Sequence, residues 1–190
     1  MSIYLVVAPP NKLEEKNRVG GWRNVPWTRE AKKQLHAMAA DLKGKAVKYV
    51  AGSDLDSEAG NLLASELNVP FREDFRLRRF NCGRHHAAKS DHFADVLERL
   101  FGQWSANPDI PVRGGDSLTS LNKRLLKTAR AILASEDEIA FVTDSRTASF
   151  VIYGTPKSLN MNGGGLKAGK IYVLKGKNAD TDKSMERAAS

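Results

Sequence analysis

Residues 17–28 read NRVGGWRNVPWT, and they set the interpretation of the chain on either side. The paired glycines and the proline predict a loop, because these residues favour turns over helices and strands. Before the loop, Ile3 to Val7 form a short apolar run rich in β-branched residues, which predicts a buried strand. After it, Thr28 is placed to cap a helix from Arg29 to about Leu42. The chain therefore opens with a strand, a long loop and an amphipathic helix.

The remaining sequence continues this alternation of strands and helices. Further strands are expected at residues 46–51, 69–71, 139–142 and 171–174. Further helices are expected at residues 57–67, 91–104, 116–134 and 145–153, with Asp116 capping the third of these. This order predicts a three-layer α/β/α fold with a mostly parallel central sheet. Ligands of such sheets bind beyond the carboxyl ends of the strands.

Length and composition limit the class of protein. The 190 residues suit one domain, expected over 1–175, followed by a polar, flexible tail at 176–190. A single cysteine, Cys82, cannot form an internal disulfide, which favours a reducing, cytoplasmic setting. We expect no membrane association, since no apolar run approaches the ~20 residues that span a bilayer. The net charge of +8 favours anionic partners or a solvated basic surface.

Five segments, in chain order, resemble the histidine phosphatase superfamily, whose fold is phosphoglycerate-mutase-like. Residues 17–28 are similar to the family segment that follows its first catalytic motif and leads into a helix. The other four are GSDL at 52–55, LRRFNCG at 77–83, GGDSL at 114–118 and FVTDS at 141–145. The resemblance covers residues 3–175 and implies a phosphoglycerate-mutase-like fold.

The resemblance also implies a reaction and the residues that it requires. A histidine in an Arg-His-Gly motif attacks phosphorus, two arginines and a second histidine neutralise the phosphoryl group, and an acid protonates the leaving oxygen. In this chain the corresponding positions hold Val7, Ala8, Ser57, Arg79 and Asp144. None of these side chains suits the role that the family gives to its position. We therefore expect a pseudoenzyme without catalytic residues, metal or cofactor.

A basic segment follows the third predicted strand, and the resemblance implies that it lies beside the former active site. The candidates for binding an anion or a partner are Lys12, Arg18, Arg78, Arg79, Arg84, His85, His86 and Arg146. The first hypothesis is a structural or interaction protein that binds a protein or assembly with an acidic face. The alternatives are a solvated charge run, a binder of a phosphorylated or other anionic small molecule, and a diverged hydrolase with non-family catalytic residues. Nucleic acid is the least favoured partner.

Three smaller groups of residues each have a functional and a structural interpretation. Cys82 with three nearby histidines suggests zinc, although a buried cysteine and surface histidines are favoured. Asp54 and Asp144, each at a strand end, suggest either a divalent cation or helix caps. The three tryptophans suggest a base-stacking platform, but packing in the core and in loops is favoured.

Overall fold

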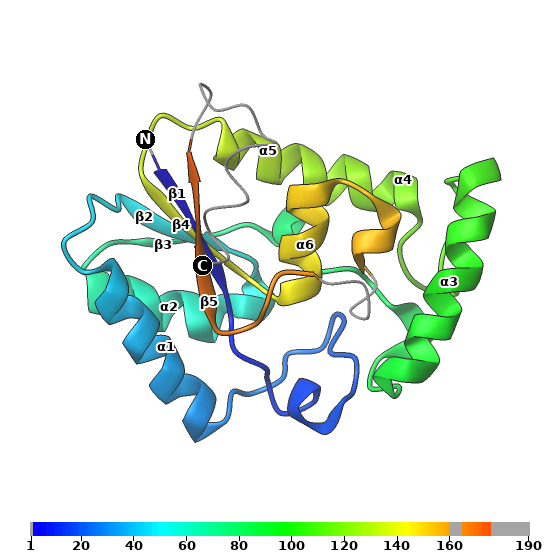
Figure 1. Cartoon of the computed structure of the whole chain (residues 1–190), viewed down its shortest axis with the longest axis horizontal. Coiled ribbons are helices and arrows are strands. Elements are labelled where there is room, and N and C mark those ends of the chain that lie inside the picture. Colours follow the sequence, from blue (N-terminus) through cyan, green and yellow to red (C-terminus); the bar gives the residue numbers. More distant parts are fainter. Residues whose placement is uncertain (1, 160–164, 176–190) are drawn as a thin grey trace.

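The computed structural model describes residues 2–159 and 165–175, and a five-stranded sheet lies at its centre (Figure 1). The strands are β1 (Ser2–Val7), β2 (Tyr49–Gly52), β3 (Phe71–Glu73), β4 (Ile139–Thr143) and β5 (Lys170–Lys175). Their order across the sheet is β3-β2-β4-β1-β5. β5 pairs antiparallel to β1, and the other pairs are parallel. This confirms the predicted mostly parallel sheet.

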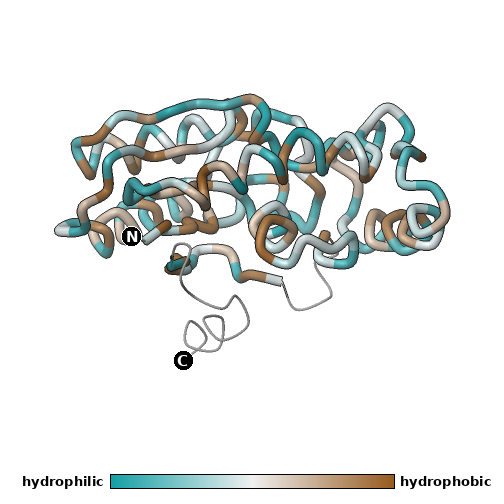
Figure 2. Tube along the Cα trace, turned by 90° about the horizontal axis from the view of Figure 1, so that it is seen from above, coloured by the Kyte–Doolittle hydropathy of each residue, from teal (hydrophilic) through white to brown (hydrophobic). Residues whose placement is uncertain are grey.

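Helices cover both faces of the sheet, as the α/β/α prediction requires (Figure 1; Figure 2 gives the view from above). They are α1 (Arg29–Leu42), α2 (Ser57–Leu67), α3 (Ser90–Ala106), α4 (Leu118–Leu121), α5 (Lys127–Leu133) and α6 (Ser145–Tyr153). Side chains alternate along β1, so the odd-numbered ones from Ile3 to Val7 pack with α3, α4, α5 and α6. The even-numbered ones from Tyr4 to Ala8 pack with α1 and α2. Two apolar layers therefore hold the sheet between the helices.

The predicted helices at 57–67 and 145–153 are confirmed at both ends. The Thr28 cap is also confirmed, because its hydroxyl accepts the Ala31 N–H at 3.1 Å. The prediction that Asp116 caps the next helix is wrong. Ser117 is the cap, since it and Ser120 accept each other's backbone N–H. A π-helical turn at Asn122–Leu126 then joins α4 to α5.

Two strand predictions also need correction. The strand expected at 69–71 lies at 71–73, because Val69 still donates its N–H to Ala64 at the end of α2, where Asn68 is left-handed. The strand expected at 46–51 begins at Tyr49. The predicted tail at 176–190 lies outside the described residues. Within the described part of the chain, no helix combines the length and apolar character needed to cross a bilayer.

Candidate functional site

The parallel strands β1, β2 and β4 end along one edge of the sheet, and the predicted site lies there. Ala8 follows β1, is buried, and donates its N–H to the carbonyl of Thr143 at 2.9 Å. The 3₁₀ turn Asp54–Asp56 follows β2, and Asp144 follows β4. The position that the resemblance gives to the nucleophile thus presents only a buried methyl group.

Arg79, which the sequence suggested as a candidate for binding an anion or a partner, lies inside this site. Its side chain is 4% exposed and its guanidinium contacts Asp56, whose side chain is fully buried. Nη1 lies 3.4 Å from Glu14 Oε1, and Nε lies 3.4 Å from Asp144 Oδ2. We call Glu14, Asp56, Arg79 and Asp144 the Arg79 cluster. A guanidinium held by three carboxylates occupies the centre of the site.

The electrostatics of the Arg79 cluster keep the arginine charged. Burial acts to lower the pKa of Arg79, but the charges of Asp56, Asp144 and Glu14 outweigh it and hold that pKa above its usual value. Burial raises the pKa of Asp56, and the neighbouring Arg79 charge opposes this rise. Burial likewise raises the pKa of Glu14, and the Arg79 charge opposes this rise. The Nη1 and Nη2 donors of Arg79 are thus directed at carboxylates of the protein, whereas its buried Nε has no hydrogen-bond partner among the described residues.

Local structure positions each carboxylate of the Arg79 cluster. The Asn11 side chain accepts the Glu14 N–H at 3.2 Å, and the Glu14 carboxylate accepts the Asn11 N–H at 2.9 Å. Asp56 also accepts a hydrogen bond from the Ser53 hydroxyl at 2.6 Å. Asp144 caps α6 by accepting the Thr147 N–H at 2.6 Å, which confirms the helix-cap interpretation of this residue. Backbone hydrogen bonds thus hold two of the three acids in place.

Arg78, next to Arg79 in sequence, lies in a different environment. It is half-buried and donates from Nε to Asp54 at 2.7 Å, which holds the pKa of that carboxyl below its usual range. Its guanidinium also stacks on Trp22, 4.8 Å from the ring centre. The Trp22 indole donates to the Arg79 carbonyl at 2.7 Å. Asp54 is therefore an ion-pair partner and not a helix cap, and Arg78 has a charge partner within the chain.

A cavity of about 50 Å³ lies beside the Arg79 cluster. Of the candidate binding residues, it brings together Arg18, Arg79 and Arg146, while Glu14 and Asp144 line the same space. Lys12, Arg78, Arg84, His85 and His86 do not line it. The negative charges of two acids therefore offset part of the positive charge of the three arginines that line the cavity.

The other predicted site residues have varied surroundings. Lys12 and Arg84 are exposed, and Arg18, also exposed, donates to the Ala87 carbonyl at 2.7 Å. His86 is half-buried and accepts the Trp22 N–H at 3.2 Å through Nδ1. Arg146 is half-buried over Phe93, 5.1 Å from the ring centre. Ser57 begins α2.

Cys82 is buried as expected, and burial raises the pKa of its thiol to about 12. In the described residues, no group of three or more His, Cys, Asp or Glu side chains is arranged to hold a metal ion. Trp27 and Trp104 are buried, which confirms their packing role. The indole of Trp104 donates to the Ile110 carbonyl at 2.7 Å.

Sequence reasoning missed three residues of the site: Glu14, Asp56 and Arg124. Arg124 donates to Asp116 at 2.7 Å and contacts the carbonyl of Arg78, so it fixes the loop that carries the two arginines. The position of Asp56 in the short turn that follows β2 was a usable indication. Glu14 and Arg124 lie in ordinary charged surroundings in the sequence, and nothing local marks them.

The fold is therefore that of an α/β protein with a mostly parallel sheet, and a pocket lined by arginines and acids lies at the strand ends. Residues 4–157 match the histidine phosphatase superfamily (branch 1), and the chain belongs to this family. No protein among curated sequences matches this chain.

Several solved structures share the fold. Bacillus stearothermophilus YhfR is 17% identical with a TM-score of 0.72, over 93% of this chain and 92% of its own. The alpha-ribazole phosphatase of Shigella flexneri is 14% identical with a TM-score of 0.72, over 94% of this chain and 92% of its own. A mycobacterial glucosyl-3-phosphoglycerate phosphatase is 16% identical with a TM-score of 0.68, over 90% of this chain and 88% of its own. At these identities the likeness is one of fold.

Proposed function

We propose that this chain is a pseudophosphatase, a family member that does not hydrolyse phosphate esters and that binds a protein partner through a basic face. The Arg79 cluster carries the proposal. The resemblance places the family's acid at position 79 and its second histidine at position 144, and here these positions hold an ion pair. The former phosphate-binding centre thus holds an internal cation and three acids.

The chemistry of phosphoryl transfer argues against turnover at this site. A phosphohistidine mechanism needs a nucleophile, and Ala8 has none. It also needs cations that stabilise the transferring group, where loss of a single donor costs roughly 3–4 kcal/mol of transition-state stabilisation. Asp56 and Asp144 would instead repel a phosphate dianion. These losses act together, so we expect no residual family activity.

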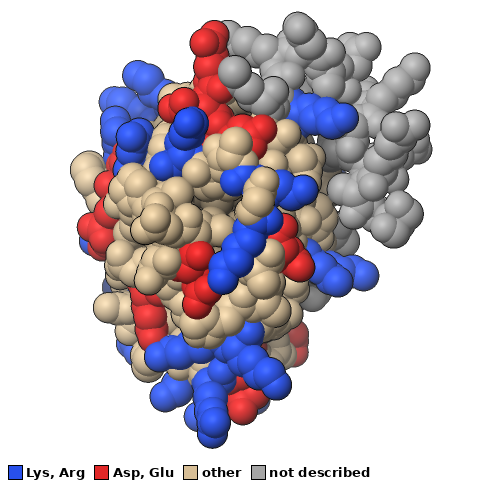
Figure 3. Space-filling view, turned by 90° about the vertical axis from the view of Figure 1, so that its left-hand side faces the viewer, with Lys and Arg blue, Asp and Glu red and all other residues tan. Residues whose placement is uncertain are grey.

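A partner-binding role is supported by exposed cations close to the site. Lys12, Arg18 and Arg84 are exposed, and no described carboxylate lies within 4.0 Å of their charged nitrogens. By contrast, the face seen in Figure 3 shows lysines and arginines interspersed with acids. On α1 and α2, Lys32 forms an ion pair with Glu58. Unpaired surface cations favour association with an acidic surface.

Two measurements test the proposal. The first is turnover of p-nitrophenyl phosphate and of a phosphoglycerate by wild type and by Asp144→Ala, for which we expect no activity in either. Hydrolysis by wild type that Asp144→Ala abolishes would overturn the pseudoenzyme proposal. The second compares retention of proteins on immobilised wild type with retention on Lys12→Glu/Arg18→Glu/Arg84→Glu.

The control for the second measurement is Lys33→Glu/Lys45→Glu/Lys48→Glu, which makes the same change of charge at three exposed lysines remote from the site. We expect a specific partner to be lost with the first variant and kept with the control. Equal retention by both variants would contradict a role for the basic face.

A second candidate function is binding of a small phosphorylated or other anionic molecule. Arg18 and Arg146 at the cavity favour it, while Glu14 and Asp144 oppose it. A rise in thermal stability with a phosphorylated compound, lost in Arg146→Gln, would support this candidate over the protein-binding role.

A further inference from the structure

A second group of cations lies apart from the Arg79 cluster, where the 3₁₀ turn Gly83–His85 meets α3. The His85 and His92 rings are 6.0 Å apart, centre to centre, although they come from different elements. Arg84 precedes His85 in the same turn, and Arg99 lies seven residues after His92 on α3. We call Arg84, His85, His92 and Arg99 the α3 basic cluster.

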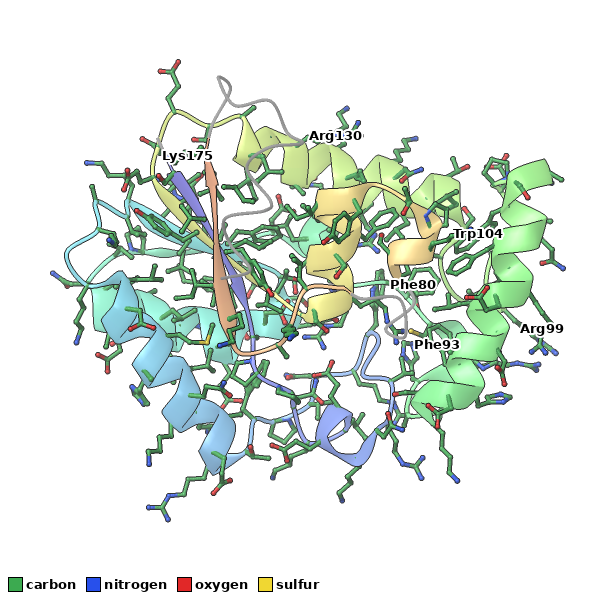
Figure 4. All side chains as sticks on the ribbon, in the orientation of Figure 1. Phe80, Phe93, Arg99, Trp104, Arg130 and Lys175 are labelled. Atoms are coloured by element: carbon green, nitrogen blue, oxygen red, sulfur yellow. The ribbon has the colours of Figure 1, made fainter. Side chains whose placement is uncertain are left out.

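The α3 basic cluster is exposed to solvent and held in place. Arg84, His92 and Arg99 are exposed, and Arg99 points outward from α3 in Figure 4. The His85 ring packs 5.8 Å, centre to centre, from that of the buried Phe93. Gly83 has φ +53°, and a Cβ there would lie 2.2 Å from the Arg113 carbonyl, so this turn requires glycine. The turn and the His85 ring are therefore preorganised, which lowers the cost of binding at this part of the cluster.

The charges around the α3 basic cluster are unevenly balanced. Arg113 adjoins it, because its carbonyl accepts the Arg84 N–H at 3.2 Å. Asp95 follows His92 by three residues and precedes Arg99 by four, so it shares their helix face and offsets part of the charge. Asp91 and Glu98 are the other acids of the same stretch of α3. Arg146 lies across Phe93 on α6.

Apart from Glu98, no carboxylate in the described part of the chain lies within 4.0 Å of a charged nitrogen of the α3 basic cluster. The four cations exceed the nearby acids once the imidazoles are protonated. Burial, together with the charges of Arg84, His92 and Arg99, lowers the pKa of His85. An anion bound to the cluster would oppose the effect of these positive charges on the pKa of His85.

The shape of the α3 basic cluster selects the kind of anion. Its residues do not line the cavity at the Arg79 cluster, so they offer a surface and not a closed pocket for one small ion. His92 and Arg99 are two helical turns apart, about 10 Å along the axis at 1.5 Å per residue. An extended peptide covers that length in about three residues. Carboxylates spaced along one segment match this geometry.

We propose that the α3 basic cluster docks a carboxylate-rich, extended segment of a protein partner, and that docking tightens as the pH falls from 7.5 to 6. This inference rests on the proposed binding function and names its surface and partner chemistry. Because a neighbouring carboxylate favours the protonated imidazole of His85, binding takes up a proton on this ring. Affinity therefore rises as the pH falls and levels off once His85 is protonated in the free protein.

The test uses a fluorescein-labelled twelve-residue peptide of aspartate and glycine, with binding followed by anisotropy at constant ionic strength. We expect wild type to bind at least three-fold more tightly at pH 6 than at pH 7.5. His85→Gln/His92→Gln should bind like wild type at pH 7.5 and lose the gain at pH 6. Arg84→Gln/Arg99→Gln should bind at least five-fold more weakly at both values.

The control is His36→Gln, which removes a histidine paired with Glu66 on another face and should keep the gain. No binding by wild type, equal affinities at both pH values, or a gain that survives in His85→Gln/His92→Gln would each overturn the inference. Phosphatase turnover by wild type would overturn the proposed function but would not bear on binding at the α3 basic cluster. A partner that is lost in Lys12→Glu/Arg18→Glu but kept in Arg84→Gln/Arg99→Gln would overturn only the inference.

Discussion

Replacement of Arg79 by methionine tests the central feature of the site, the guanidinium surrounded by three acids. Methionine keeps much of the side-chain volume and removes the charge. Asp56, which is fully buried, then loses its cation and keeps only the Ser53 hydroxyl as a partner. Glu14 and Asp144 are 23% and 12% exposed, so water compensates part of their loss. The dominant cost is therefore one uncompensated buried carboxylate.

The size of that cost follows from known buried ion pairs. Removal of one partner destabilises a protein by about 3–5 kcal/mol. The free energy of unfolding of a single domain is about 5–15 kcal/mol, so Arg79→Met should remove a large fraction of the stability. For a chain of this length the shift in melting temperature is about 6–20 °C, at 2–4 °C per kcal/mol.

The loss should also depend on pH. The pKa of Asp56 is already raised by burial, and without the Arg79 charge it rises further. The folded state then binds a proton that the unfolded state releases, so the variant gains stability relative to wild type as the pH falls. We expect the difference between the two proteins to be smaller at pH 5 than at pH 8. Arg79→Met/Asp56→Asn should recover part of the loss, because it removes the uncompensated carboxylate.

Urea unfolding followed by circular dichroism measures these differences. Arg76→Met is the matched control, since Arg76 pairs with Asp74 but is 58% exposed, and we expect it to cost less than about 1 kcal/mol. An Arg79→Met loss as small as that of the control, or one that is independent of pH, would refute the assignment of Arg79 to a buried ion cluster.

Three further predictions concern other parts of the fold. Cys82, buried with a pKa of about 12, should resist thiol reagents at pH 8 in the folded protein and react fully in urea; fast reaction while folded would contradict its burial. Thr28→Ala should lower unfolding free energy by about 1 kcal/mol through loss of the α1 cap, whereas the exposed Thr119→Ala should change it little. Gly83→Ala should destabilise the fold and weaken binding of the aspartate peptide, because the added Cβ would meet the Arg113 backbone. Peptide affinity equal to that of wild type, measured by anisotropy, would show that the α3 basic cluster does not depend on this turn.

The sequence by itself determined the class of fold, and with the family resemblance it led to the expectation that the catalytic residues are replaced. Apolar periodicity and local capping placed α1, α2 and α6 closely, because these features depend on residues within a few positions of each other. The substitutions at Ala8 and Asp144 are also visible from their place after predicted strands. Helix and strand ends that depend on distant contacts, such as those of β3, were less accurate.

Only the tertiary structure decided the roles of the charged residues. Arg78 and Arg79 are neighbours in a basic run, yet Arg78 stacks on Trp22 at the surface of the site and Arg79 is buried with Asp56. Glu14 and Asp144 each lie 65 residues from Arg79, one before it and the other after it. Electrostatic energy depends on distance in space and on burial, and neither quantity is encoded in the local composition of a charged segment.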